Sequence, residues 1–179
     1  MSNQSEFKEY PWFRQYDQGV PHHIPYPDQD VFALLQAKVA ERPQVTALLF
    51  FGKETSYRQL MDKINSCMEA MQRLGIKKGD KVALLLPNCP QYVISYYAIM
   101  GLGAVVVPVN PLSTETELVY IFRDGSVRMA IALDLLAGRL EKVRDQLHGE
   151  GRKDLLEFTF YTSIKEELPF PLNVLYPLK

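Results

Sequence analysis

The chain has almost no charge imbalance and almost no cysteine. Its 20 basic and 21 acidic residues leave a formal charge of -1 over 179 residues, so no electrostatic surface for nucleic acid or an anionic membrane is expected. The two cysteines, Cys67 and Cys89, lie in apolar stretches without CxxC or metal spacing. They predict buried reduced thiols, which suit a cytoplasmic protein.

Nucleotide and metal motifs are also missing. No GKS or GKT occurs, which excludes a P-loop. Gly101 and Gly103 begin a GxGxxG-like run, but its sixth residue is Val106 and the glycines follow a helical pattern instead of opening one. Tight helix-to-strand packing is therefore favoured over pyrophosphate binding. No histidine has a cysteine or carboxylate at ligand spacing, so solvent-exposed imidazoles are expected at His22, His23 and His148.

One uncharged stretch, residues 92–109, is long enough to raise the question of a membrane-spanning helix. Its two glycines, the β-branched run Val105–Val107 and the following Pro108 interrupt that pattern. A buried helix leading into a buried strand is the favoured interpretation, and a spanning helix is the weaker alternative.

Helical and strand patterns alternate through most of the chain, and the strands are continuously apolar. Such strands predict an α/β fold with a mostly parallel sheet flanked by helices on both faces. Capping residues are expected at Asp30, Ser56, Asn88 and Thr114, and Gly125 is expected to stop a helix. The predicted strands are 45–51, 82–86, 104–107, 127–133 and 155–162, and the predicted helices are 30–43, 56–75, 90–102, 114–124 and 134–147.

Three segments are predicted. Residues 1–29 are rich in aromatic residues and proline, which predicts an extended strap on a surface of this molecule or of a second copy. Residues 30–163 form the α/β unit, and residues 164–179 form an irregular tail.

The most plausible ligand contact is the strand exit Val109-Asn110-Pro111. It follows a predicted parallel strand, and ligands of open α/β sheets bind at that edge. Thr114 opens the next helix, whose terminal amides could face an anion. The alternative is a rigid strand-to-helix connection without a ligand.

A series of short motifs resembles the N-terminal region of the adenylate-forming acyl-CoA synthetases. The order and spacing of the set carry the resemblance, since each piece is weak alone. The motifs are Thr55-Ser56-Tyr57, Gly79-Asp80-Lys81-Val82, Pro87-Asn88, Gly103 to Pro111, Glu117-Leu118 and Asp124-Gly125-Ser126. Flanking segments, from Pro11-Trp12 to Tyr26-Pro27 and from Thr162 to Pro177, resemble bacterial long-chain fatty acid–CoA ligases in particular.

The resemblance implies the large N-terminal domain of an enzyme that joins a fatty acid to coenzyme A, with ATP split to AMP and diphosphate. Mg-ATP and coenzyme A would serve the full-length enzyme. Tyr161-Thr162-Ser163 matches the start of the family's phosphate loop, but Ile164 to Glu167 contains no glycine and two carboxylates. No catalytic or metal-binding residue is therefore assigned, no cofactor is expected to bind this chain, and the chain alone is expected to be inactive.

In the related short-chain enzymes, the exit matching Val109-Asn110-Pro111 lies near the coenzyme A path, which makes these three residues the only candidate site. Two other functions stay open. The chain could be a short interaction module that forms a homodimer through the strap, or a dinucleotide-binding oxidoreductase, for which NAD binding would be required. A full-length ligase could also associate peripherally with a membrane, without a transmembrane segment.

Overall fold

The computed structural model describes residues 10–176. Its centre is a four-stranded sheet in the order β4-β3-β5-β6, in which every neighbouring pair is parallel. The strands are β3 (Lys81–Leu85), β4 (Val105–Pro108), β5 (Val127–Leu133) and β6 (Phe158–Thr162). Residues 82–85 and 129–133 are buried, as expected for strands covered on both faces.

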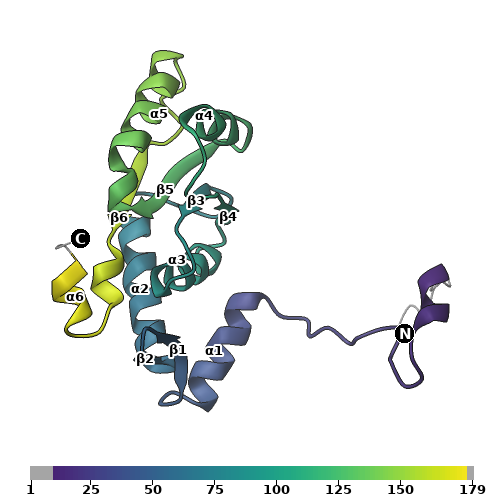
Figure 1. The fold of residues 1–179 in the computed structure, drawn as a ribbon. Coiled ribbons are helices and arrows are strands. Elements are labelled where there is room, and N and C mark those ends of the chain that lie inside the picture. Colours follow the sequence, from purple (N-terminus) through teal and green to yellow (C-terminus); the bar gives the residue numbers. More distant parts are fainter. Residues whose placement is uncertain (1–9, 177–179) are drawn as a thin grey trace.

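Helices cover both faces of this sheet. The pair α2 (Tyr57–Arg73) and α3 (Pro90–Gly101) lies on one face, and the pair α4 (Glu115–Asp124) and α5 (Ala137–Gly149) lies on the other (Figure 1). Helix α1 (Val31–Glu41) packs against α2 and α3. The predicted α/β class with a parallel sheet is confirmed, and among residues 10–176 no helix is long and apolar enough to cross a membrane.

A separate antiparallel hairpin precedes α2. Its strands are β1 (Thr46–Phe50) and β2 (Lys53–Ser56), and they do not join the parallel sheet. The turn carries Phe51 at a φ of 49° and Gly52 at 84°. A phenylalanine in the left-handed region is unusual, and this residue is 65% exposed at the tip of the hairpin.

The predicted caps are partly correct. Capping boxes at Ser56 and Thr114 and the cap at Asp30 are confirmed, each with a side-chain oxygen that accepts from the backbone three residues on. Asn88 was the wrong cap for α3, because Pro90 occupies the first helical position and Cys89 therefore stands at the N-cap. Gly125 keeps a helical φ of -70°, and Ser126 adopts the left-handed φ of 51° instead.

Both ends of the chain contain more regular structure than expected. Pro11–Gln15 forms a 3₁₀ turn, Ile164–Glu167 forms another, and α6 (Leu172–Leu175) is a single helical turn, so the tail is not wholly irregular. These elements have only four or five residues, which is too short for a periodic apolar pattern to reveal them in the sequence. Residues 1–9 and 177–179 of the predicted strap and tail lie outside the described residues.

The arm, residues 10–30, extends away from the rest of the molecule (Figure 1). Residues 14–30 are exposed. Near its end Phe13 is 9% exposed, because His22 stacks on its ring at 4.3 Å and Tyr10 and Tyr16 meet it edge-on. The arm therefore has a small aromatic cluster of its own and does not lie on the surface of this copy.

Two side-chain predictions need adjustment. His148 is only partly exposed, because its Nε2 lies 2.9 Å from the Leu155 carbonyl oxygen. Both cysteines are free thiols, with Cys89 buried and Cys67 half-buried. Burial raises the pKa of Cys67 to about 11, so this thiol is protonated at neutral pH.

Candidate functional site

The carboxyl ends of the four parallel strands lie at one edge of the sheet, which is the edge where ligands of open α/β sheets bind. The chain leaves β3 toward α3 and β4, whereas it leaves the adjacent β5 toward α5 and β6. The exits of β3 and β5 therefore lead in opposite directions, and such a divergence produces a crevice at the strand ends.

The predicted site residues form the exit of the edge strand β4. Val109 is 6% exposed, and its N–H donates to the Leu84 carbonyl at 3.0 Å. Asn110 is exposed; its Oδ1 accepts from the Leu112 N–H at 2.9 Å and its carbonyl accepts from Ser113 at 3.0 Å. Val109 is therefore part of the framework, and Asn110 presents the exposed polar group of the three predicted residues.

Arg139 on α5 holds this exit in place. Its Nη1 donates to the Pro111 carbonyl at 3.1 Å and to the Ser113 carbonyl at 2.8 Å. The residue is partly buried. Nothing in the local sequence links Arg139 to a loop 26 residues earlier, so sequence patterns did not identify this contact.

The N-terminus of α4 is poorly suited to an anion. Glu117 Oε2 accepts from the Thr114 N–H at 2.8 Å, and the Thr114 hydroxyl oxygen accepts from the Glu117 N–H at 3.3 Å. The hydrogen bond from the Thr114 backbone holds the pKa of Glu117 below its usual range. Because Glu117 and Glu115 place negative charge in the first turn, a phosphate at these amides is disfavoured. 

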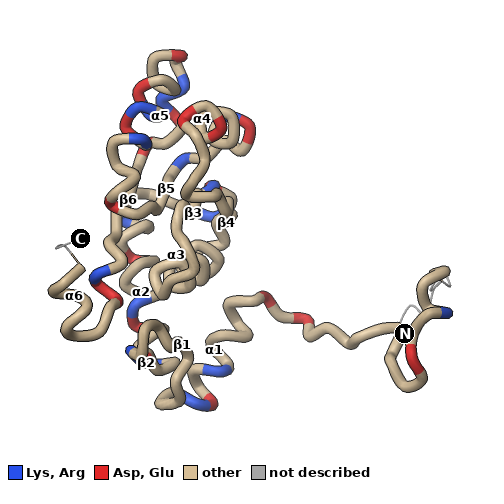
Figure 2. The backbone as a smooth tube through the Cα atoms, in the orientation of Figure 1, with Lys and Arg blue, Asp and Glu red and all other residues tan. Residues whose placement is uncertain are grey.

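An apolar pocket of about 440 Å³ lies at the exit of β3. Three parts of the chain form it: the hairpin tip, the β3–α3 connection and the C-terminal segment. Its walls are Phe50, Phe51, Pro87, Asn88, Cys89, Ile164, Leu168, Leu172, Leu175 and Tyr176. The sequence contained a signal for it, since residues 168–176 include no charged side chain; Figure 2 shows this turn without acidic or basic residues.

The one sulfur in this pocket is not an activated nucleophile. Cys89 is 5% exposed at the start of α3. Burial raises the pKa of its thiol, and this effect outweighs the hydrogen bonds from the Tyr92 and Gln91 backbone that favour the thiolate. A neutral thiol is a weak nucleophile, so Cys89 is a wall residue.

Glu167 fixes the C-terminal segment that closes the pocket. It is 7% exposed and accepts hydrogen bonds from Lys53 on β2, at 3.1 Å, and from Lys63 on α2. Burial alone would raise the pKa of Glu167, but the hydrogen bonds from Lys63 and Lys53 outweigh it and lower the pKa. One of the two carboxylates in this turn is therefore a buried anchor for the C-terminal segment.

The segment after β6 is not a phosphate-binding loop. Tyr161 and Thr162 end the strand and Ser163 leads directly into a 3₁₀ turn. Gln91 Nε2 donates to the Ser163 carbonyl at 3.0 Å, while the Thr162 hydroxyl donates to Glu166 Oε2 at 3.0 Å. Within residues 10–176 there is also no group of three or more histidine, cysteine or acidic residues arranged for a metal ion.

Comparison with known proteins gives consistent matches. A family model described as AMP-binding enzyme matches residues 35–168. The long-chain-fatty-acid–CoA ligase of Bacillus subtilis (strain 168) is 39% identical over 168 residues, which cover 94% of this chain and 29% of that protein. The corresponding ligase of Escherichia coli O6:H1 is 34% identical over 141 residues, covering 75% and 24%. This chain thus spans less than a third of the length of these curated relatives.

The fold is also found among solved structures. The N-terminal domain of FACL13 from Mycobacterium tuberculosis superposes with a TM-score of 0.67 at 26% identity, covering 75% of this chain and 34% of that domain. A fatty acyl CoA synthetase of the same organism gives a TM-score of 0.65 at 25% identity, with coverage of 76% and 27%.

Proposed function

This chain belongs to the AMP-binding enzyme family, and we propose that it serves as part of the N-terminal domain of a long-chain fatty acid–CoA ligase. The observation that carries the proposal is the 39% identity to a ligase of that name over 94% of this chain. The overall reaction would join a fatty acid to coenzyme A as ATP is converted to AMP and diphosphate. Fatty acid, Mg-ATP and coenzyme A are then substrates of the full-length enzyme.

Within such an enzyme the chain acts as framework. The adenylation step concentrates negative charge on phosphoryl oxygens, and it needs backbone amides, hydroxyls, cations or a metal aimed at them. The predicted anion contact at α4 has glutamates in its first turn, and the turn after β6 has no glycine. We therefore assign the phosphoryl chemistry to parts of the ligase outside this chain and expect no turnover by the chain alone.

The test is a chimera in which this chain replaces the matching 168-residue region of the Bacillus subtilis relative. The chimera should form palmitoyl-CoA from palmitate, ATP and coenzyme A, whereas the purified chain alone should form none. A chimera that is folded by circular dichroism but inactive would contradict the ligase assignment. Turnover by the chain alone would contradict the framework role.

The exit of β4 is our proposal for the coenzyme A approach. It supplies the exposed Asn110 side chain at the carboxyl edge of the sheet, with Val109 and Pro111 held in the framework on either side. In the chimera, Asn110→Ala should raise the KM for coenzyme A about three- to tenfold, as for one lost hydrogen bond, and leave the KM for ATP unchanged. Asn65→Ala, on the exposed side of α2, is the matched control.

A second candidate function is that of an interaction module. The extended arm and its aromatic cluster support this function. Because the arm extends away from the body of its own copy, it is free to contact a second copy of the chain. A homodimer through residues 1–29 is the form we propose.

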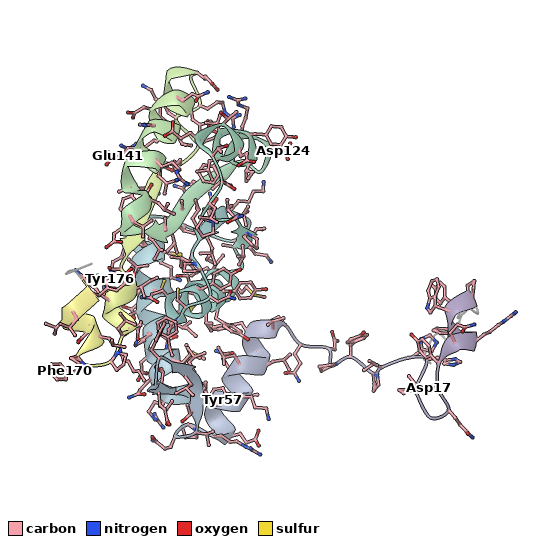
Figure 3. The ribbon with its side chains drawn as sticks, in the orientation of Figure 1. Asp17, Tyr57, Asp124, Glu141, Phe170 and Tyr176 are labelled. Atoms are coloured by element: carbon pink, nitrogen blue, oxygen red, sulfur yellow. The ribbon has the colours of Figure 1, made fainter. Side chains whose placement is uncertain are left out.

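If the chain is part of a ligase, we propose that the ligase is located in the cytoplasm, where its thiols stay reduced. It would associate peripherally with a membrane through exposed apolar side chains such as Phe170 (Figure 3).

A further inference from the structure

Residues 169–176 have no polar bond to the body of the molecule, among the residues that the structure describes. The turn before them is anchored, because Gln91 donates to the Ser163 carbonyl and two lysines hold the Glu167 carboxylate. Beyond this turn, the hydrogen bonds of residues 169–176 all lie within the segment that contains α6 (Figure 1). The segment is therefore fixed where it starts, and it can move about that anchor without breaking a polar contact.

This segment forms one wall of the apolar pocket at the exit of β3. Leu172 and Leu175 of α6 line the pocket and are still 43% and 49% exposed, whereas Leu168 beside the anchor is 7% exposed. Leucines that face a space of about 440 Å³ and stay half-exposed are only partly packed against protein atoms. An apolar occupant of the pocket would remove this surface from water.

The α6 wall lies outside the part of the chain that matches the family. The AMP-binding enzyme model ends at residue 168, immediately before the segment. The hairpin tip and the β3–α3 connection, which form the other walls, lie within the matched region. The pocket therefore combines common framework with an added wall, and its occupant does not follow from the family assignment.

The composition of the walls favours an occupant with few hydrogen-bonding groups. Among the described residues, the polar side chains that line the pocket are Asn88, Cys89 and Tyr176, and none of its lining residues is charged. A polypeptide would bring an N–H and a C=O group for nearly every residue into a space that can pair few of them, which is unfavourable. A hydrocarbon chain brings no such group, so its burial is favourable along its whole length.

We propose that this pocket binds one unbranched hydrocarbon chain, and that residues 169–176 are a lid that closes on it. An apolar cavity of about 150 Å³ can bind benzene, so a space of about 440 Å³ can hold a chain of roughly ten or more carbons. The chain is that of a long-chain fatty acid, and this choice rests on the proposed ligase function. Its carboxylate stays outside, because no charged side chain among the described residues lines the pocket.

The thiol of Cys89 reports whether the pocket is occupied. Cys89 lines the pocket and is 5% exposed, whereas Cys67 lines a different groove and is half-buried. Iodoacetamide labelling of both thiols in the purified chain is followed by peptide mass spectrometry, with and without monomeric dodecanoate. Dodecanoate should slow the labelling of Cys89 at least about fivefold, because binding favours the closed lid, and leave Cys67 unchanged. An unchanged Cys89 rate, or equal slowing of both thiols, would overturn the proposal.

Two further ligands test which chemistry the pocket recognises. Dodecanol has the same chain with an uncharged end, and it should protect Cys89 as dodecanoate does. Dodecanedioate has a carboxylate at both ends, so its binding would bury a charge without a charged partner, and it should not protect. Protection by dodecanedioate would indicate binding to an exposed surface and contradict the pocket. Protection by dodecanoate without protection by dodecanol would contradict a site for the chain.

A pair of substitutions in α6 tests the lid. Leu175→Asp places a charge on the pocket wall, and Val174→Asp places the same charge on the adjacent residue, which does not line the pocket and is 60% exposed. Leu175→Asp alone should remove most of the dodecanoate protection of Cys89. Equal effects of the two variants would contradict the lid.

The chimera with the Bacillus subtilis relative separates this inference from the ligase assignment. Dodecanoate should protect Cys89 there as well, whatever the activity of the chimera. A Cys89 that is fully protected without dodecanoate, and unaffected by it, would assign the pocket to the rest of the ligase and overturn the proposal. Failure of the chimera to form palmitoyl-CoA would contradict the ligase assignment and with it the choice of a fatty acid, but not the pocket or the lid.

Discussion

Glu167 illustrates how a single residue can anchor a segment. It lies in the turn after β6, yet its carboxylate reaches lysines on β2 and α2 and ties together three elements far apart in the sequence. The lysines are about one-third exposed, so solvent screens part of the attraction, while the carboxylate itself is largely enclosed. Its contribution to the free energy of unfolding should therefore lie between that of a surface ion pair and that of a buried one.

We expect Glu167→Gln to lower the free energy of unfolding by about 1–2 kcal/mol. The folded-state pKa of Glu167 is lowered, so its stabilisation is fully present above the unfolded pKa of about 4.3 and is lost as the pH falls through the folded value. Urea unfolding should therefore show the full difference at pH 7 and a smaller one below about pH 4.

Glu166→Gln is the matched control for this prediction, because Glu166 is exposed and, among residues 10–176, its carboxylate accepts a hydrogen bond only from the Thr162 hydroxyl. It should change the stability by less than about 0.5 kcal/mol. An equal loss in both variants, or a Glu167→Gln difference that does not shrink in acid, would show that the lysine contacts do not stabilise the segment.

The elements of the chain are defined chiefly at their ends. Helices α2 and α4 begin with complete capping boxes, in which a hydroxyl residue and a side chain three positions later satisfy each other's backbone N–H. One turn requires a particular residue type. Gly103 has a φ of 67°, and an added Cβ would lie 3.1 Å from Lys78 Cγ. The loop between α3 and β4 therefore requires glycine at this position.

At this scale Ser56→Ala should lower the free energy of unfolding by about 1 kcal/mol, since it removes the oxygen that accepts from the Gln59 N–H. Ser66→Ala in the same helix is the control. Its hydroxyl is exposed and only donates back to the Asp62 carbonyl, so this change should be neutral or slightly stabilising. Chemical unfolding followed by circular dichroism distinguishes them, and a larger effect at Ser66 would refute the capping argument.

Gly103→Ala and Gly138→Ala should have opposite signs. The first forces a left-handed alanine and should cost about 1–2 kcal/mol. The second lies within α5, where nothing stands within 4 Å of an added Cβ, and alanine should stabilise that helix by up to about 1 kcal/mol. Thermal unfolding of both variants provides the comparison; two changes of the same sign would contradict the backbone assignment.

The whole molecule has a well-packed body and several uncovered apolar surfaces. The sheet and its helices bury a continuous core, while the arm, the hairpin tip, the α6 turn and the β6 edge retain exposed aromatic or aliphatic side chains. Exposed aromatic residues include Trp12, Tyr26, Phe51 and Phe170. Such surfaces usually mark contacts with other polypeptide or with lipid.

Deletion of residues 1–29 should leave the unfolding of the body unchanged within about 0.5 kcal/mol, because the arm extends away from it. If the arm forms the proposed homodimer, light scattering should give a dimer mass for the full chain and a monomer mass for the deletion variant. Identical monomer masses would exclude the dimer, and a loss of body stability would show that the arm contacts its own copy.

Much of the fold was predictable from local patterns. Strand β5 has the bounds expected from its apolar run, and α2 begins at its capping box and ends near Gly75. The predictions of individual residues were wrong at helix ends, where two adjacent residues could each serve as the cap or as the left-handed residue. Cys89 replaced Asn88 as the cap, and Ser126 replaced Gly125 as the left-handed residue. In both cases the choice depended on where the helix starts or stops within one residue.

The sequence by itself determined the class, the order of the elements and the family, because these follow from periodicity, caps and short ordered motifs. Only the tertiary structure decided which strands are edges, that Arg139 holds the β4 exit, that Glu167 joins two lysines, and that a pocket lies at the exit of β3. The reason is physical: these features join residues distant in the chain, and such contacts leave no local pattern of hydrophobicity or charge.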